Sequence, residues 1–108
     1  AGECSASIRE RVMAARRLQG SRYADTPFRS NAALSGKALQ RYCRLRPEGR
    51  AILLRAMEEL SLSARAYDRI LKVARTIADL DGSPAIQAMH ISEAIGYRSL
   101  DRGAWGGN

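Results

Sequence analysis

The stretch Ser63–Leu80, SARAYDRILKVARTIADL, decides the fold of this chain. Its apolar residues recur at intervals of three and four: Tyr67, Ile70, Leu71, Ala74, Ile77 and Ala78. This spacing predicts one buried face of an α-helix, whereas a strand would alternate every second residue. The charged residues between them are expected on the opposite face: Arg65, Asp68, Arg69, Lys72, Arg75 and Asp79. Ser63 is the expected N-cap, and Asp81–Pro84 is expected to end the helix.

Upstream of this helix, the sequence predicts a first helix and a long connector. Ser7–Glu10 fits a capping box, in which a Ser oxygen and a Glu carboxylate bind each other's backbone amides, and Gly20 is the expected end. Residues 20–34 are rich in turn-forming residues and predict an irregular connector. Tyr23 and Phe28 are its expected anchors.

Three shorter helices complete the expected fold. Ser35 is expected to cap a helix over Gly36–Arg44, and Pro47 suits the first turn of the next one. The last helix is expected over about Met89–Arg98. In the first of these helices the residues expected to face inward are Leu39, Tyr42 and Cys43. The next has a broad apolar stripe of Ile52, Leu53, Ala56, Met57 and Leu60, and the last carries Ile91, Ala94, Ile95 and Tyr97. Because no segment alternates as a strand would, the sequence predicts an all-α protein, a compact bundle of about five helices.

The composition is that of an ordinary soluble domain. The 108 residues are 45% hydrophobic and 27% charged, and no apolar run approaches the roughly 20 residues of a membrane span. Cys4 and Cys43 are expected to be free thiols in a reducing compartment, which indicates the cytoplasm and no membrane. The chain lacks an initial Met, and we expect a fragment: residues 1–6 a tag remnant or disordered start, residues 7–102 one helical domain, and residues 103–108 a disordered tail.

The net charge of +7 is concentrated in one half of the chain. Residues 1–50 contain eleven Lys or Arg and four Asp or Glu, whereas residues 51–108 contain seven of each. A basic half is consistent with binding to nucleic acid or another polyanion. It is equally consistent with a solvated Arg-rich surface or a face that meets an acidic neighbour, since charge alone says little about specificity.

Two single residues stand out as candidates. His90 is the only histidine, so we predict no His-based metal site and expect a partly exposed side chain in the first turn of the last helix. Arg65 falls in the first turn after Ser63, where the helix dipole disfavours a cation by about 0.3–1 kcal/mol. This position suits an arginine that binds an external anion. The alternative is a solvated Arg65 paired with Asp68 or Glu58.

The segment Leu62–Leu80 resembles the C-terminal region of magnesium-chelatase-like AAA+ ATPases, in particular the ComM/YifB branch associated with competence. Flanking segments resemble further parts of that family in the expected order. Arg9–Arg22 is similar to its Arg/Gln-rich linker helix, Asn31–Lys37 to its Asn-containing loop and Tyr97–Arg102 to its closing segment. The resemblance covers about residues 7–102.

The resemblance implies a helical lid that follows a nucleotide-binding α/β core. Arg65 occupies the family's Ser-x-Arg position and would act as sensor 2, approaching the terminal phosphate of ATP. Arg69 would be a secondary phosphate or subunit-interface contact. ATP and Mg²⁺ would belong to the full-length parent, and the isolated chain would have no catalytic residue, no cofactor and no ATPase activity, because these 108 residues lack the phosphate-binding loop.

The implied partners are the parent's own ATPase core and neighbouring subunits of a ring, expected to be a hexamer. A ComM-like parent would be a DNA-processing motor linked to DNA uptake and recombination. Two other interpretations remain open. One is a stand-alone basic helical domain that binds DNA, and the other is a helical adaptor that serves only protein interactions.

Overall fold

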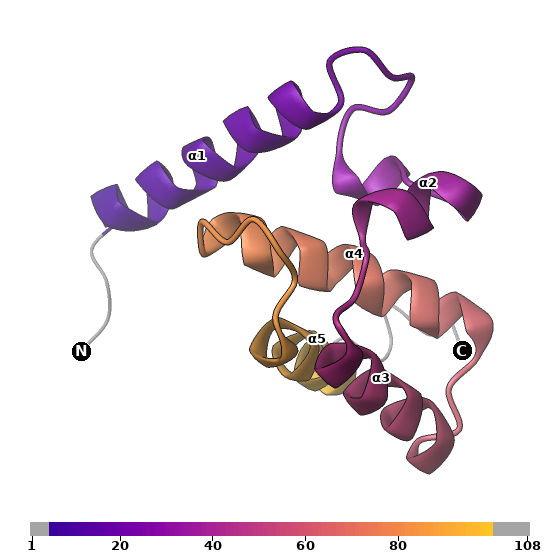
Figure 1. Ribbon diagram of the computed structural model, residues 1–108. Helices are drawn as coiled ribbons and strands as arrows, with labels where there is room; N and C mark the ends of the chain where they lie inside the picture. Colours follow the sequence, from indigo (N-terminus) through magenta and orange to yellow (C-terminus); the bar gives the residue numbers. More distant parts are fainter. Residues whose placement is uncertain (1–4, 101–108) are drawn as a thin grey trace.

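The computed structural model of the chain describes residues 5–100. Of the tag remnant or disordered start expected over residues 1–6, residues 1–4 lie outside the described part, as does the tail expected over residues 103–108, whereas Ser5 and Ala6 are helical. Five α-helices and one short 3-10 helix follow in chain order (Figure 1): α1 (Ser5–Arg22), η1 (Asn31–Ala33), α2 (Gly36–Tyr42), α3 (Pro47–Glu59), α4 (Ala64–Leu80) and α5 (Ala88–Leu100). Within the described residues there is no strand, only an isolated bridge between Leu45 and Ile86. The predicted all-α bundle is therefore confirmed.

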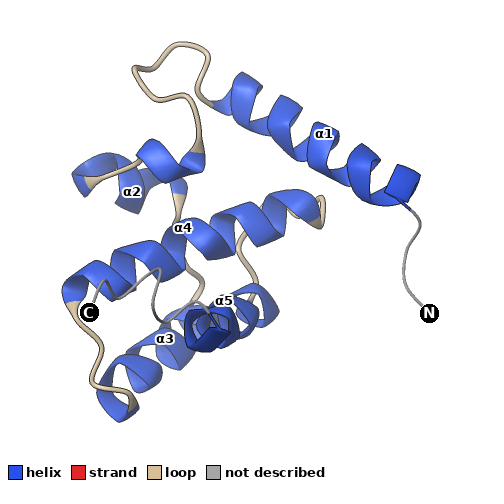
Figure 2. Cartoon of the chain, turned by 180° about the vertical axis from the view of Figure 1, so that it is seen from behind, coloured by secondary structure: helices blue, strands red, loops and turns tan. Residues whose placement is uncertain are grey.

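Helix α4 is the centre of the bundle. Figures 1 and 2 show it between α1 and α2 on one side and α3 and α5 on the other. The predicted cap is present, because the Ser63 hydroxyl oxygen accepts a hydrogen bond of 3.2 Å from the Ala66 amide. Ile70, Ala74 and Ala78 are fully buried on the predicted apolar face. The other helices therefore pack around α4, whose apolar face the sequence periodicity predicted.

The hydrophobic core lies on both sides of α4. It contains these buried residues: Tyr23, Leu34, Leu39, Cys43, Leu53, Ile70, Leu71, Ala74, Ala78, Ile86, Ile91 and Ala94. Gly49 lies where α3 meets α5, and an added Cβ would lie 3.5 Å from Cγ1 of Ile91, an ordinary van der Waals distance. A side chain larger than a methyl group at this position would push the two helices apart.

The boundaries predicted for α1 are wrong at both ends. The helix already includes Ser5, so Ser7 lies inside it and does not cap it, and it passes through Gly20 to Arg22. A glycine inside a helix costs only about 0.5–1 kcal/mol. Tyr23, directly after the helix, is buried in the core and holds this last turn in place.

The connector is shorter than predicted and partly ordered into η1. Its anchors are confirmed, because Tyr23 is buried and Phe28 packs edge-to-face against it with ring centroids 6.5 Å apart. Helix α2 ends at Tyr42, two residues before its predicted end. Leu60 was expected inside, but it lies at the C-cap of α3 and is 44% exposed, because the chain turns there at Ser61 with φ of 51°.

The described residues contain no helix that combines the length and the apolar character needed to cross a lipid bilayer.

Candidate functional site

Arg65 is exposed in the first turn of α4, and this turn contains no acidic residue. Its side chain forms no hydrogen bond or ion pair with a described residue, so the alternative pairing with Asp68 or Glu58 is absent. The amides of Ala66 and Tyr67 are bound by the Ser63 side chain and carbonyl. The amides of Ala64 and Arg65 precede them and have no acceptor within the helix. This end of α4 therefore presents a guanidinium and two backbone donors to the outside.

Arg69 lies one turn further along α4 in a different environment. It is half-buried beside a cavity of about 520 Å³ that is lined by Ala32, Arg69, Lys72, Val73, Thr76, Ile77, Leu80 and Tyr97. Lys72 is fixed at this cavity, since its Nζ donates to the carbonyl of Ala32 at 3.2 Å. The structure therefore brings Arg65 and Arg69 to adjacent turns, but only Arg65 extends into solvent.

The residues around Arg65 fit a phosphate group. A guanidinium and two helix-terminal amides are donors that match phosphate oxygens. Metal-bound triphosphate needs carboxylate or hydroxyl ligands as well, and the described residues contain no group of three or more metal-ligating side chains.

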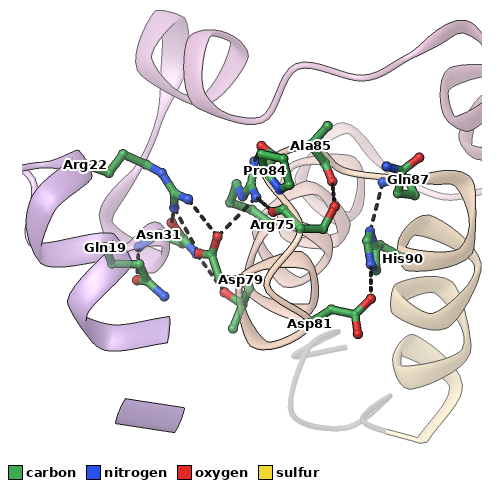
Figure 3. A network of polar contacts seen from close by, with 12 residues as sticks. Gln19, Arg22, Asn31, Arg75, Asp79, Asp81, Pro84, Ala85, Gln87 and His90 are labelled. Atoms are coloured by element: carbon green, nitrogen blue, oxygen red, sulfur yellow. Dashed lines mark hydrogen bonds and ion pairs between the residues drawn. The ribbon is translucent and has the colours of Figure 1, made fainter. Parts of the chain in front are cut away.

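A second polar site, which we call the Asp79 cluster, consists of Arg22, Asn31, Arg75 and Asp79 (Figure 3). The buried Asp79 carboxylate accepts two hydrogen bonds from Arg22, of 2.7 and 2.9 Å, and one of 3.0 Å from the Asn31 side-chain amide. Nη2 of Arg75 completes the cluster at 3.1 Å. One carboxylate on α4 therefore connects α1, η1 and its own helix.

Two members of the Asp79 cluster, Arg75 and Asn31, also form hydrogen bonds with residues outside the cluster. Arg75 donates to the carbonyls of Ser83 and Pro84 at 3.0 and 3.4 Å, which ties down the turn between α4 and α5. The side-chain oxygen of Asn31 accepts a 2.6 Å hydrogen bond from the Tyr23 hydroxyl, and the backbone amide of Asn31 donates to Oε1 of Gln19 at 3.0 Å. The cluster thus fixes where α1 leaves the bundle and where α5 begins.

The charges in the Asp79 cluster stabilise one another. Burial alone would raise the pKa of Asp79, but the hydrogen bonds from Arg22 and Asn31 and the charge of Arg75 lower it below its usual value. The hydrogen bond to Asp79 in turn raises the pKa of Arg22. The charged pattern of α4 predicted Arg75 and Asp79 on the face opposite the apolar one. This prediction is wrong, because the two residues are only 5% and 2% exposed.

His90 also differs from its expected place. It lies in the first turn of α5, as predicted, but it is 1% exposed instead of partly exposed. Its Nδ1 accepts from the Gln87 amide at 2.9 Å, and its Nε2 donates to Asp81 at 3.0 Å. The first bond matches one half of a capping box, in which the third helical residue binds the amide of the N-cap residue. The buried His90 side chain therefore stabilises the first turn of α5.

Replacing His90 with Ala is expected to lower the free energy of unfolding by about 2–4 kcal/mol. The change removes a buried ring and leaves the Gln87 amide without its acceptor. Urea unfolding followed by circular dichroism measures the loss. Met89→Ala is the matched control, because Met89 is 63% exposed in the same turn and should change stability by less than about 0.5 kcal/mol. Similar losses in both variants would contradict the capping role.

Cys43 has no part in either polar site. Cys43 is a free, buried thiol, as predicted, and burial raises its pKa to about 11. A thiol with so high a pKa is almost entirely protonated near neutral pH, which makes it unreactive. Cys4 lies outside the described residues.

Comparisons with known proteins support the resemblance seen in the sequence. Residues 2–98 match the family model of "Magnesium chelatase, subunit ChlI C-terminal". The chain is 45% identical to the competence protein ComM of Haemophilus influenzae and 44% identical to YifB of Escherichia coli, each over 101 residues and 94% of this chain. A relative from Mycobacterium tuberculosis is 37% identical over 90% of the chain.

The relatives are much longer than this chain. The aligned region is 19% of the length of each of the three relatives, so the chain spans about a fifth of them. The family model matches nearly every described residue, including both α4 and the Asp79 cluster. The chain therefore belongs to the magnesium chelatase ChlI C-terminal family, as the C-terminal domain found in ComM and YifB homologues.

Proposed function

We propose that this domain is the helical lid of a ring-forming AAA+ ATPase, in which Arg65 acts as sensor 2 at the terminal phosphate of ATP. The observation that carries the proposal is the position of Arg65: an exposed cation without a described partner, in a helix turn where local stability favours an acid. An arginine that only stabilised the domain would be placed where the helix dipole favours it.

The proposed role of Arg65 is electrostatic. A planar guanidinium donates two parallel hydrogen bonds to phosphate oxygens, and the neighbouring first-turn amides favour the same anion. Because the side chain is not held by the domain itself, it is available to a phosphate presented from outside. ATP and Mg²⁺ would be held by the ATPase core of the full-length protein, and Arg69 would make a secondary phosphate or subunit-interface contact.

The proposed partners follow from the resemblance to magnesium-chelatase-like AAA+ ATPases. As the lid of such a protein, the domain would contact the parent's ATPase core and the neighbouring subunits of a ring, which we expect to be a hexamer. One relative is named a competence protein. We therefore infer that the parent is a DNA-processing motor of the cytoplasm. Substituting Arg65 in the full-length ATPase is the decisive test.

The isolated 108-residue chain is expected neither to hydrolyse ATP nor to bind it tightly. Most of the affinity for a triphosphate comes from a backbone cradle and magnesium ligands, and Arg65 with two amides supplies neither. Isothermal titration calorimetry of the chain with Mg·ATP should show no binding in the micromolar range. A micromolar dissociation constant would show that the domain holds a nucleotide site of its own and would contradict the proposal.

A further inference from the structure

A surface formed by α2 and the start of α3 is strongly basic. We call it the α2–α3 basic patch, and it consists of Lys37, Arg41, Arg44, Arg46 and Arg50. All five side chains are exposed, and residues 36–50 contain a single acid, Glu48. The patch accounts for much of the positive charge of the first half of the chain.

The cations of the α2–α3 basic patch are not used to hold the fold together. None of the five forms an ion pair with a described residue. The guanidinium of Arg41 lies 5.3 Å from the ring centroid of Tyr42. Lys37 and Arg41 are four residues apart and share one side of α2. A series of exposed, uncompensated cations suits a ligand with repeated negative charges.

A cavity of about 540 Å³ lies between α2, α3 and α4, and two of the five cations, Arg44 and Arg50, line it. Gln40 and Asp68 also line it on the exposed side, whereas the lining residues Leu39 and Leu71 are buried. The exposed lining of the cavity is therefore mostly polar. The half-buried Tyr67 adds an aromatic side chain to the lining.

We propose that the α2–α3 basic patch binds single-stranded nucleic acid, with phosphates on Arg44 and Arg50 and one unstacked base in the cavity. Arginine binds phosphate oxygens, and the ring of Tyr67 in the cavity lining is an aromatic surface on which a base can stack. Gln40 and Asp68 can hydrogen-bond to base edges, because they supply an amide and a carboxylate at the entrance.

The cavity is better suited to a single strand than to a duplex. Arg44 and Arg50 are two cations beside the one Asp68 carboxylate, so charge alone also admits an acidic protein segment, which the test below includes. The bases of a duplex are paired and stacked, so that they cannot enter. This binding site rests on the proposed DNA-processing role of the parent. It does not rest on the phosphate sensing of Arg65, because its residues, and the helices that supply most of them, are different.

The test is fluorescence anisotropy of the 108-residue chain with a labelled single strand of about 15 nucleotides at low salt, a length near the upper site size of a small binding domain. Binding in the micromolar range is expected, since nonspecific contacts of this kind give dissociation constants of about 10⁻⁶ to 10⁻⁴ M at physiological salt. The double variant Arg44→Gln/Arg50→Gln should weaken binding about 10-fold or more and should reduce the slope of log K against log salt by about 1.4.

The matched control is Arg9→Gln/Arg16→Gln, which removes the same charge from exposed positions on α1. It should weaken binding by less than about threefold, because only the general attraction changes. Both double variants should keep the circular dichroism spectrum and melting temperature of the wild type, since all four residues are exposed.

Four results would overturn this inference: no binding by the wild type, equal losses in the two double variants, equal affinity for a duplex of the same length, or equal affinity for polyglutamate. Equal affinity for polyglutamate would identify the patch as a contact for an acidic protein. Arg65→Ala should leave strand binding unchanged, and its ATPase phenotype is measured separately. Failure of this inference is therefore distinguishable from failure of the sensor 2 proposal.

Discussion

Arg65→Ala in the full-length ATPase is expected to lower kcat about 100-fold. The charge that develops on the transferred phosphoryl group is stabilised by donors that are already in place, and removing one such donor costs about 10²–10³ in rate. Arg65 meets the structural requirement, since its exposed guanidinium stands beside two backbone amides with no acceptor within the helix. Steady-state ATPase assays of the wild type and variant measure the effect.

Two further variants separate a specific role of Arg65 from a general loss of charge. Arg55→Ala removes an arginine that is 79% exposed and lies 3.9 Å from Glu59 on α3, and it should leave turnover unchanged. Arg69→Ala should cost less than Arg65→Ala, because Arg69 is half-buried beside the cavity and does not extend outward from the end of the helix. Wild-type turnover in the Arg65 variant would disprove the sensor 2 assignment.

The stability of the isolated domain provides the complementary measurement. Arg65→Ala removes a cation from the positive end of a helix dipole, so the free energy of unfolding should stay the same or rise by up to about 1 kcal/mol. A structural arginine would instead lower the melting temperature. Loss of turnover together with unchanged stability is the pattern that a phosphate-contacting residue produces.

Sequence periodicity predicted the centre of the fold because α4 satisfies several local rules at once. The apolar residues are spaced at three and four, Ser63 provides a cap, and Gly82 and Pro84 end the segment. Each rule concerns residues within about one turn of each other, which sequence shows directly. The same reasoning placed Cys43 and Leu39 inside correctly.

The Asp79 cluster could not be predicted in this way because its partners are distant in sequence. Asp79 and Arg22 are separated by 57 residues, and Asp79 and Asn31 by 48. A charged residue is assigned to the surface unless its counter-charges are known. The spacing of four between Arg75 and Asp79 was visible, but such pairs are usually solvated on helix surfaces. His90 was misplaced for a similar reason, since its acceptor role depends on the turn before α5.

Asp79→Ala is the change expected to destabilise this domain most, by about 3–5 kcal/mol. The cost arises because removal of one partner of a buried ion pair leaves the other charge uncompensated. Here two guanidiniums lose their carboxylate, and the Arg22 and Arg75 side chains are only 19% and 6% exposed. The attachment of α1 to α4 and η1 should loosen first. Urea unfolding at neutral pH measures the loss, and Asp68→Ala, an exposed acid on the same helix, should change stability by less than about 0.5 kcal/mol.

The same residue makes the stability of the domain sensitive to acid. Because the pKa of Asp79 is lower in the folded protein, its contribution is fully present above the unfolded value of about 3.9 and is lost as the pH falls through the folded value. The difference in unfolding free energy between the wild type and Asp79→Asn, which does not titrate, should therefore be constant from pH 7 to about pH 5 and shrink below about pH 4. Unfolding curves at successive pH values test this, with Asp68→Asn as the exposed control. The difference in unfolding free energy could instead stay constant down to pH values at which the exposed carboxylates are protonated. That result would mean that the charge of the Asp79 carboxylate does not hold α1 in place.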